Sequence, residues 1–145
     1  MPPGSIVVAL EALSSMDDVE GLRRLEAELK SVTPSSLSPA EYQAFFALFE
    51  RFPDHDGHGL FRVMIHLLER SSNYERYLVQ SLRRQPCELN TSMVFRIINA
   101  GYTRVGGVDA RHLLAVAAAN VNTPASVRAS ILEFIGGQQT QRAGA

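Results

Sequence analysis

The chain of 145 residues has the length of one ordinary domain, and 14 basic against 15 acidic residues leave a formal net charge of −1. That balance lacks the basic excess that is typical of a nucleic-acid-binding domain. The apolar run from Ile6 to Leu10 has no basic residue before it and Glu11 directly after it, so it predicts neither a signal peptide nor a membrane span. The single cysteine, Cys87, allows no internal disulfide, and a reducing cytoplasm is therefore the expected location.

The N-terminal region, residues 1–37, is expected to be helical. Ser15, with Asp18 three positions on and leucines following at spacings of three and four, predicts a capped amphipathic helix over about residues 17–32. Pro34 ends this helix, because proline cannot continue it.

The clearest helix start is the segment SPAE, where Ser38 and Glu41 can each cap a free backbone amide of the other. The helix that follows carries a wide stripe of aromatic side chains, which indicates core packing and not a cofactor site. Six helices are predicted after residue 38, with bounds at 39–52, 59–70, 73–85, 90–100, 109–120 and 124–135.

Polar capping residues mark the starts of the last three helices, namely Asn90, Asp109 and Thr123. Gly136 is expected to end the last helix, because glycine readily adopts the left-handed conformation found at helix ends. Residues 136–145 are therefore predicted to form a flexible tail.

No segment shows the sustained alternation of apolar and polar residues that predicts a β-sheet. The chain is accordingly predicted to be one all-α domain spanning residues 1–145. Short connections make successive helices antiparallel neighbours, and residues 38–135 divide into three helical pairs. We expect these antiparallel helical hairpins to stack as a small HEAT-like α-solenoid, with a compact orthogonal helical bundle as the alternative.

The segment FPDHDGHGLF at residues 52–61 is the densest cluster of ligand-type side chains in the sequence. It begins like a calcium-binding loop, but the twelfth position is Ile65 where a bidentate carboxylate is required. His55 and His58 could share a zinc ion with an aspartate, but a closed tetrahedral site needs further histidines or cysteines, and no metal or cofactor is expected. The favoured interpretation is a turn in which Asp56 caps the next helix, while the two histidines have no evident structural role and are exposed.

Catalytic and phosphate-binding motifs are absent from the sequence, including G-x-x-x-x-G-K-[ST], G-x-S-x-G and H-E-x-x-H. Cys87 and His112 offer a thiol and an imidazole, but nothing in the sequence brings them together. The sequence therefore favours a binding protein over an enzyme. A small metal-dependent enzyme or regulator is the least favoured class.

Three segments carry a family resemblance: FPDHDGHGLFRVMIHLLE at residues 52–69, YERYLVQSLRRQPCELNTSMVFRIINAG at 74–101 and GGVDARHLLAVAAANVNTPASVRASILEFI at 106–135. Together they resemble the small all-helical immunity proteins of bacterial polymorphic toxin systems, the group with HEAT-like helical pairs. The most recognisable parts are the Asp-x-Asp-Gly-x-Gly loop and the INAG helix end followed by GGVD.

This resemblance implies a cytoplasmic protein that binds a cognate toxin domain and covers its active site, with no cofactor, nucleic acid or membrane involved. Carboxylates such as those of Asp54 and Asp56 would suit the basic substrate groove of a nuclease or a nucleotide-processing toxin. A helical-repeat adaptor is the alternative. The loop side chains expected to contact the toxin are Asp54, His55, Asp56, His58, Tyr74, Glu75, Tyr102 and Arg104.

Overall fold

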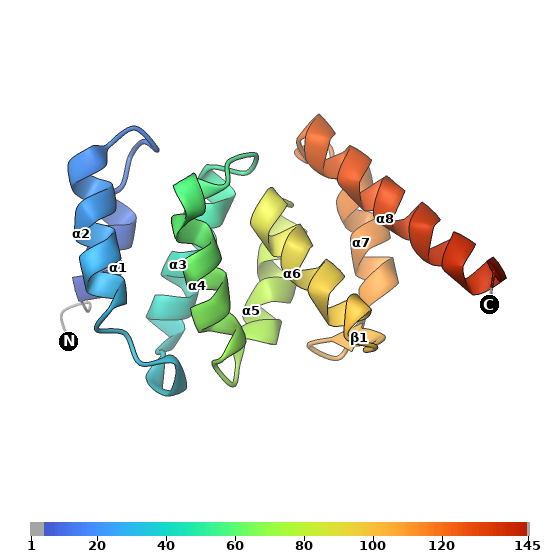
Figure 1. Cartoon of the computed structure of the whole chain (residues 1–145), viewed down its shortest axis with the longest axis horizontal. Helices are drawn as coiled ribbons and strands as arrows, with labels where there is room; N and C mark the ends of the chain where they lie inside the picture. The colour runs from blue at the N-terminus through green and yellow to red at the C-terminus, as the bar shows by residue number, and fades with distance from the viewer. Residues whose placement is uncertain (1–4, 145) are drawn as a thin grey trace.

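The computed structural model describes residues 5–144, with side chains described through residue 137 (Figure 1). This part of the chain holds eight α-helices and one short hairpin, so the all-α prediction is confirmed. The elements are α1 (Ser5–Ala12), α2 (Val19–Leu29), the 3₁₀ turn η1 (Pro34–Ser36), α3 (Pro39–Arg51), the 3₁₀ turn η2 (Gly57–Gly59), α4 (Leu60–Glu69), α5 (Tyr74–Arg84), α6 (Glu88–Asn99), β1 (Arg104–Val105), β2 (Val108–Asp109), α7 (Ala110–Ala119) and α8 (Ala125–Gly144).

Successive helices run in opposite directions and follow one another along the long axis of the molecule (Figure 1). One row of contacts joins α1 to α3, α3 to α5 and α5 to α7. A second row joins α4 to α6 and α6 to α8. The two rows meet where α3 contacts α4, α5 contacts α6 and α7 contacts α8, and α2 packs on α1. Whether these pairs belong to the HEAT-like class stays a prediction.

The aromatic stripe of α3 lies in the core. Phe45, Phe46 and Phe49 are fully buried, and Phe61 from α4 meets the ring of Phe49 edge to face at 5.2 Å between ring centroids. Burial of large apolar side chains is the main favourable contribution to folding, so this cluster holds α3 and α4 together.

Local capping determines where several helices begin. The Ser38 hydroxyl accepts a hydrogen bond from the Glu41 amide at 3.2 Å, and the Glu41 carboxylate accepts one from the Ser38 amide at 2.9 Å. The predicted capping box is therefore confirmed. Asp18 and Asp109 likewise accept a backbone amide from the first turn of α2 and α7.

The predicted end of the last helix was wrong, because α8 continues from Ala125 through Gly136 to Gly144. A glycine ends a helix when it takes the left-handed conformation, and Gly136 does not. The predicted cap Thr123 was also misplaced: its hydroxyl donates to the Ala117 carbonyl at 2.6 Å and closes the end of α7 instead. Of the predicted tail, residues 136–144 are thus helical, and residue 145 lies outside the described part.

The two-residue strands β1 and β2 were not predicted. They pair antiparallel through Arg104 with Asp109 and Val105 with Val108, around Gly106 and Gly107, whose φ angles of 54° and 80° are left-handed. Two successive left-handed residues form the turn that matches the twist of a hairpin. Strands of two residues are too short to show the alternation on which a sequence-based prediction depends.

Asn90 was predicted as a helix cap, but α6 begins at Glu88 and Asn90 is a buried side chain in its first turn. Its carboxamide oxygen accepts from the Cys87 amide at 2.8 Å, and its nitrogen donates to the Ser81 hydroxyl and the Gln85 carbonyl, both at 3.0 Å. The bonds to Ser81 and Gln85 join the end of α5 to the start of α6, and the bond from Cys87 caps α6 itself.

Replacing Asn90 by alanine is expected to lower the free energy of unfolding by about 2–4 kcal/mol, because buried polar groups lose their partners and a cavity opens. Urea unfolding followed by circular dichroism measures this difference. Gln80→Ala, at an exposed position of α5, is the matched control and should change stability by about 0.5 kcal/mol or less. Equal stability of the two variants would show that the Asn90 network is dispensable.

Candidate functional site

The eight side chains predicted to contact a partner lie at two opposite edges of the molecule (Figure 1). Residues 54–58 belong to the connection between α3 and α4. Tyr74 and Glu75 begin α5, and Tyr102 and Arg104 belong to the connection between α6 and α7, which lies at the other edge. The predicted residues therefore form two separate surfaces.

The first surface, residues 54–59, is called the His loop below. Its backbone is unusual, because Gly57, His58 and Gly59 are all left-handed, with φ angles of 68°, 55° and 85°. A β-carbon at Gly57 would lie 2.3 Å from the Phe61 ring, so only glycine fits there. The reversal is thus built on the edge of the aromatic core.

Three side chains of the His loop make hydrogen bonds within it or to a neighbouring loop. The Asp56 carboxylate accepts from the His58 amide at 3.0 Å and so caps the 3₁₀ turn η2, whereas α4 itself begins after Gly59 without a side-chain cap, so the predicted capping of the helix is only partly met. His55 Nδ1 accepts from the Gly57 amide at 2.8 Å, and His58 Nε2 lies 3.1 Å from the Met16 carbonyl oxygen. The prediction that the two histidines have no capping or structural role was therefore wrong. The predicted exposure holds for His58, whereas His55 is half-buried.

The second surface is called the hairpin face below. It surrounds an open groove of about 470 Å³ between the ends of α4 and α6, the start of α5 and the hairpin. Ile97 and Ala100 form the apolar part of the groove. Its larger side chains are Glu69, Tyr74, Glu75, Arg96, Tyr102 and Arg104.

Hydrogen bonds fix the polar side chains of the hairpin face. Glu75 accepts from the Gly106 amide at 2.8 Å, and a β-carbon at Gly106 would lie only 3.2 Å from the Glu75 carbonyl oxygen, so the hairpin packs closely on α5. Arg104 donates to the Gly107 carbonyl across the turn. The hairpin is thereby held in one position relative to the helices.

An ion pair that the sequence analysis did not single out lines the same groove. Arg96 Nε of α6 donates a hydrogen bond of 3.0 Å to Glu69 Oε2 of α4, and Arg96 Nη2 lies 3.0 Å from Glu69 Oε1 in the same ion pair. These residues lie 27 positions apart, and no local pattern relates them. Only the pairing of α4 with α6 in space brings them together.

The two tyrosines of the hairpin face differ in environment. Burial, followed by the nearby carboxylates of Glu75 and Glu69, raises the pKa of Tyr74 to about 12. The Tyr74 hydroxyl, which any tyrosine keeps protonated at neutral pH, therefore stays protonated into the alkaline range as well and can donate a hydrogen bond. Tyr102 is 66% exposed and presents its ring to solvent.

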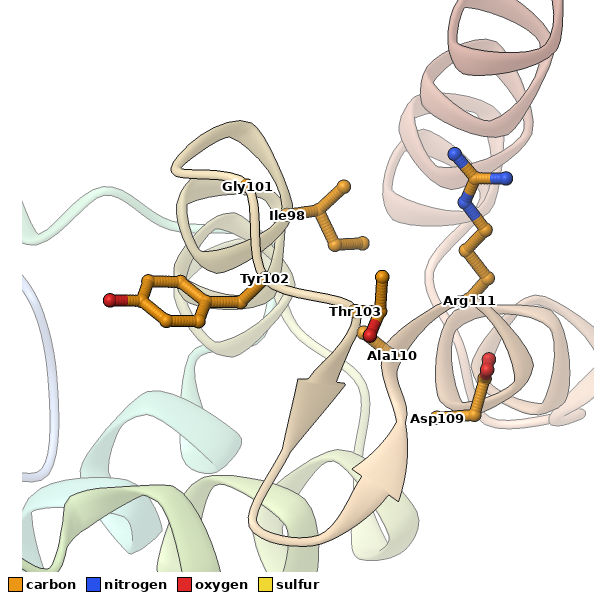
Figure 2. Close-up of a pocket in the computed structure, with 7 residues that line it drawn as sticks. All are labelled: Ile98, Gly101, Tyr102, Thr103, Asp109, Ala110 and Arg111. Carbon is orange, nitrogen blue, oxygen red and sulfur yellow. The ribbon is translucent and has the colours of Figure 1, made fainter. Parts of the chain in front are cut away.

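A second hollow of about 350 Å³ lies beyond Tyr102, between the end of α6 and the start of α7. Figure 2 shows the Tyr102 ring pointing away from Asp109 and Arg111, which lie on the far side of this hollow. The Asp109 carboxylate accepts the His112 amide at 2.9 Å and is the cap of α7. The Asp109 carboxylate in this hollow thus serves as a helix cap, and we assign the hollow no catalytic role.

Cys87 is fully buried at the start of α6. Burial raises the pKa of its thiol from an ordinary 9.0 to about 12, so the nucleophilic thiolate is strongly disfavoured. Cys87 therefore serves as a packing residue, as small buried cysteines commonly do.

Comparisons of the chain with protein-family models, with curated proteins and with solved structures find no match. Within residues 5–144, no helix combines the length and the apolar character that crossing a membrane requires. The function is therefore argued from the two surfaces themselves.

The Cys87 thiol is expected to react with DTNB on the order of a hundredfold more slowly in the folded chain than in concentrated urea at the same pH, because burial blocks access and disfavours the thiolate. Since its folded-state pKa is raised, the protonated thiol contributes stability in full below about pH 9, and that contribution falls as the pH rises toward 12. Equal labelling rates in both states would contradict this assignment.

Proposed function

We propose that this chain is an immunity protein, a cytoplasmic bacterial protein that binds a cognate toxin domain and blocks its active site by occlusion. The observation that carries the proposal is the hairpin face, a fixed surface with an exposed tyrosine beside two arginines. The family resemblance of residues 46–135 supports the same assignment.

The composition of the hairpin face favours protein recognition. Tyrosine and arginine are the side chains that contribute most often to binding free energy in protein interfaces, and Tyr102, Arg96 and Arg104 line one groove. The Tyr102 ring is exposed to solvent, and burying it against a partner would release free energy. We assign Tyr102 as the main apolar contact with the toxin.

The rigidity of this surface supports tight binding. Association costs free energy when side chains and loops must be ordered, and surfaces that are already ordered avoid part of that cost. The Glu75 bond to Gly106 and the Arg96 pair with Glu69 fix the hairpin and the groove wall before any partner arrives. Occlusion needs such a fixed shape, because the inhibitor must fill the active site of its target.

The charges of the hairpin face indicate how a partner is selected. Two carboxylates, Glu69 and Glu75, lie beside the guanidinium groups of Arg96 and Arg104. A surface that carries both positive and negative charges favours a partner whose charges are arranged in the complementary way. Charged residues at the rim of an interface mainly affect the association rate and the specificity. The carboxylates of Asp54 and Asp56 lie at the other edge, so we place toxin recognition on the hairpin face and not on the His loop.

Binding suits the described side chains better than turnover does. Cys87 is buried, Asp109 caps α7, and His55 accepts a backbone amide, so each of these candidate groups has a structural partner. An inhibitor of this kind requires no acid or base of its own.

The test is a tagged pull-down from the native host, in which wild type should capture one dominant toxin domain. The double variant Tyr102→Ala with Arg104→Glu is expected to weaken binding to that domain by about thirtyfold or more, because loss of an interface hot spot costs about 2 kcal/mol. Arg83→Glu, an exposed arginine at the far end of α5, is the matched control and should bind like wild type. Growth of cells expressing the toxin measures protection by each variant.

Three results would contradict parts of this proposal. Full binding and protection by the folded double variant would exclude the hairpin face. Loss of protection in Asp54→Lys with Asp56→Lys alone would move recognition to the His loop. Several partners of moderate affinity, with none dominant, would favour the helical-repeat adaptor.

A further inference from the structure

We propose that the His loop is a zinc-binding site, in which His55, Asp56 and His58 hold one Zn²⁺ ion and leave the fourth coordination position open. This site lies at the edge of the molecule opposite the hairpin face and does not depend on the proposed immunity function.

The spacing of the three side chains suits a single ion. One potential ligand atom from each of them lies within 4.8 Å of the others, and His55 Nδ1 is 3.7 Å from Asp56 Oδ1. In a tetrahedral zinc site with bonds of about 2.0–2.2 Å, two ligand atoms lie about 3.4 Å apart. Side-chain movements of about 1.5 Å or less therefore assemble the site, and the Asp56 side chain, 78% exposed, has the space for such a movement.

His58 already has the arrangement of a metal-binding histidine. Its Nε2 lies 3.1 Å from the Met16 carbonyl oxygen, and a carbonyl can only accept, so Nε2 carries the proton. Nδ1 then keeps its lone pair for a ligand. Histidines that bind zinc almost always donate their other ring N–H to a carbonyl or carboxylate in this way, which fixes both the tautomer and the ring orientation.

Asp56 and His55 would complete the ligand set, and they differ in whether an existing hydrogen bond must break. The Asp56 carboxylate accepts the His58 amide through one oxygen, and a carboxylate has about four acceptor positions, so it can bind the ion as well. His55 Nδ1 accepts the Gly57 amide, and zinc would take that lone pair and break the bond. His55 is therefore the weakest of the three ligands.

No metal is expected from the sequence, because a closed structural site needs four protein ligands. An open site needs only three, with water or a partner side chain in the fourth position. Imidazole nitrogen and carboxylate oxygen favour zinc over calcium, which requires six to eight oxygen ligands.

The test is isothermal titration of the full, tag-free, EDTA-treated chain with Zn²⁺ alone. We expect saturable binding of one ion per chain. His58→Asn should weaken binding by about a hundredfold, since the change removes a ligand and asparagine tolerates the left-handed conformation better than most residues. His55→Gln should weaken it less, by about tenfold. The matched controls His66→Gln and His112→Gln change the remaining two histidines and should leave the affinity unchanged.

Absence of saturable zinc binding would overturn the proposal, and so would unchanged affinity in both His58→Asn and His55→Gln. Should His58→Asn fail to fold, Asp56→Asn serves in its place and must also weaken binding. A rise in the unfolding temperature with Zn²⁺ in wild type but not in His55→Gln would independently locate the ion, because a ligand stabilises the state that binds it.

Discussion

The left-handed turn at Gly57–Gly59 is the constraint on which one whole edge of the molecule depends. The Phe61 ring packs so closely against Gly57 that no side chain fits there, and the turn must therefore reverse over the aromatic core. This reversal places His58 beside the carbonyl of Met16, in the connection between α1 and α2. The Arg51 guanidinium donates to two further carbonyls at the end of α1, so polar contacts from α3 and the turn attach the first helical pair to the rest of the chain.

A second glycine turn organises the opposite edge. Gly106 approaches the α5 backbone closely, and its amide binds the Glu75 carboxylate, so the hairpin has a fixed place against α5. Both turns depend on the ability of glycine to adopt a positive φ angle, but they position different side chains. One gathers imidazole and carboxylate groups, whereas the other presents an exposed tyrosine beside arginines. The all-α scaffold thus places the His loop and the hairpin face at separate edges of the molecule.

Features that depend on neighbours in sequence could be predicted, and features that depend on neighbours in space could not. The Ser38 capping box and the aromatic core stripe follow from residues a few positions apart, and the structure bears them out. Asn90 has the residue type of a cap but is buried between α5 and α6, where it satisfies three polar groups. The partner of His58 is likewise 42 positions away, which no local pattern reveals. Gly136 is an example of a local signal that misleads. A glycine often ends a helix, but α8 continues through Gly136 to Gly144.

The place of His58 links the proposed zinc site to the stability of the N-terminal pair. One ring nitrogen binds the Met16 carbonyl while the other is available to a metal, so an ion on Nδ1 would strengthen the bond at Nε2 by making that N–H a better donor. Binding free energy would then stabilise the junction of the α1–α2 and α3–α4 connections. The hairpin face lies at the other edge and has its own hydrogen bonds, so the proposed zinc site and the proposed toxin-binding surface are separate in this fold.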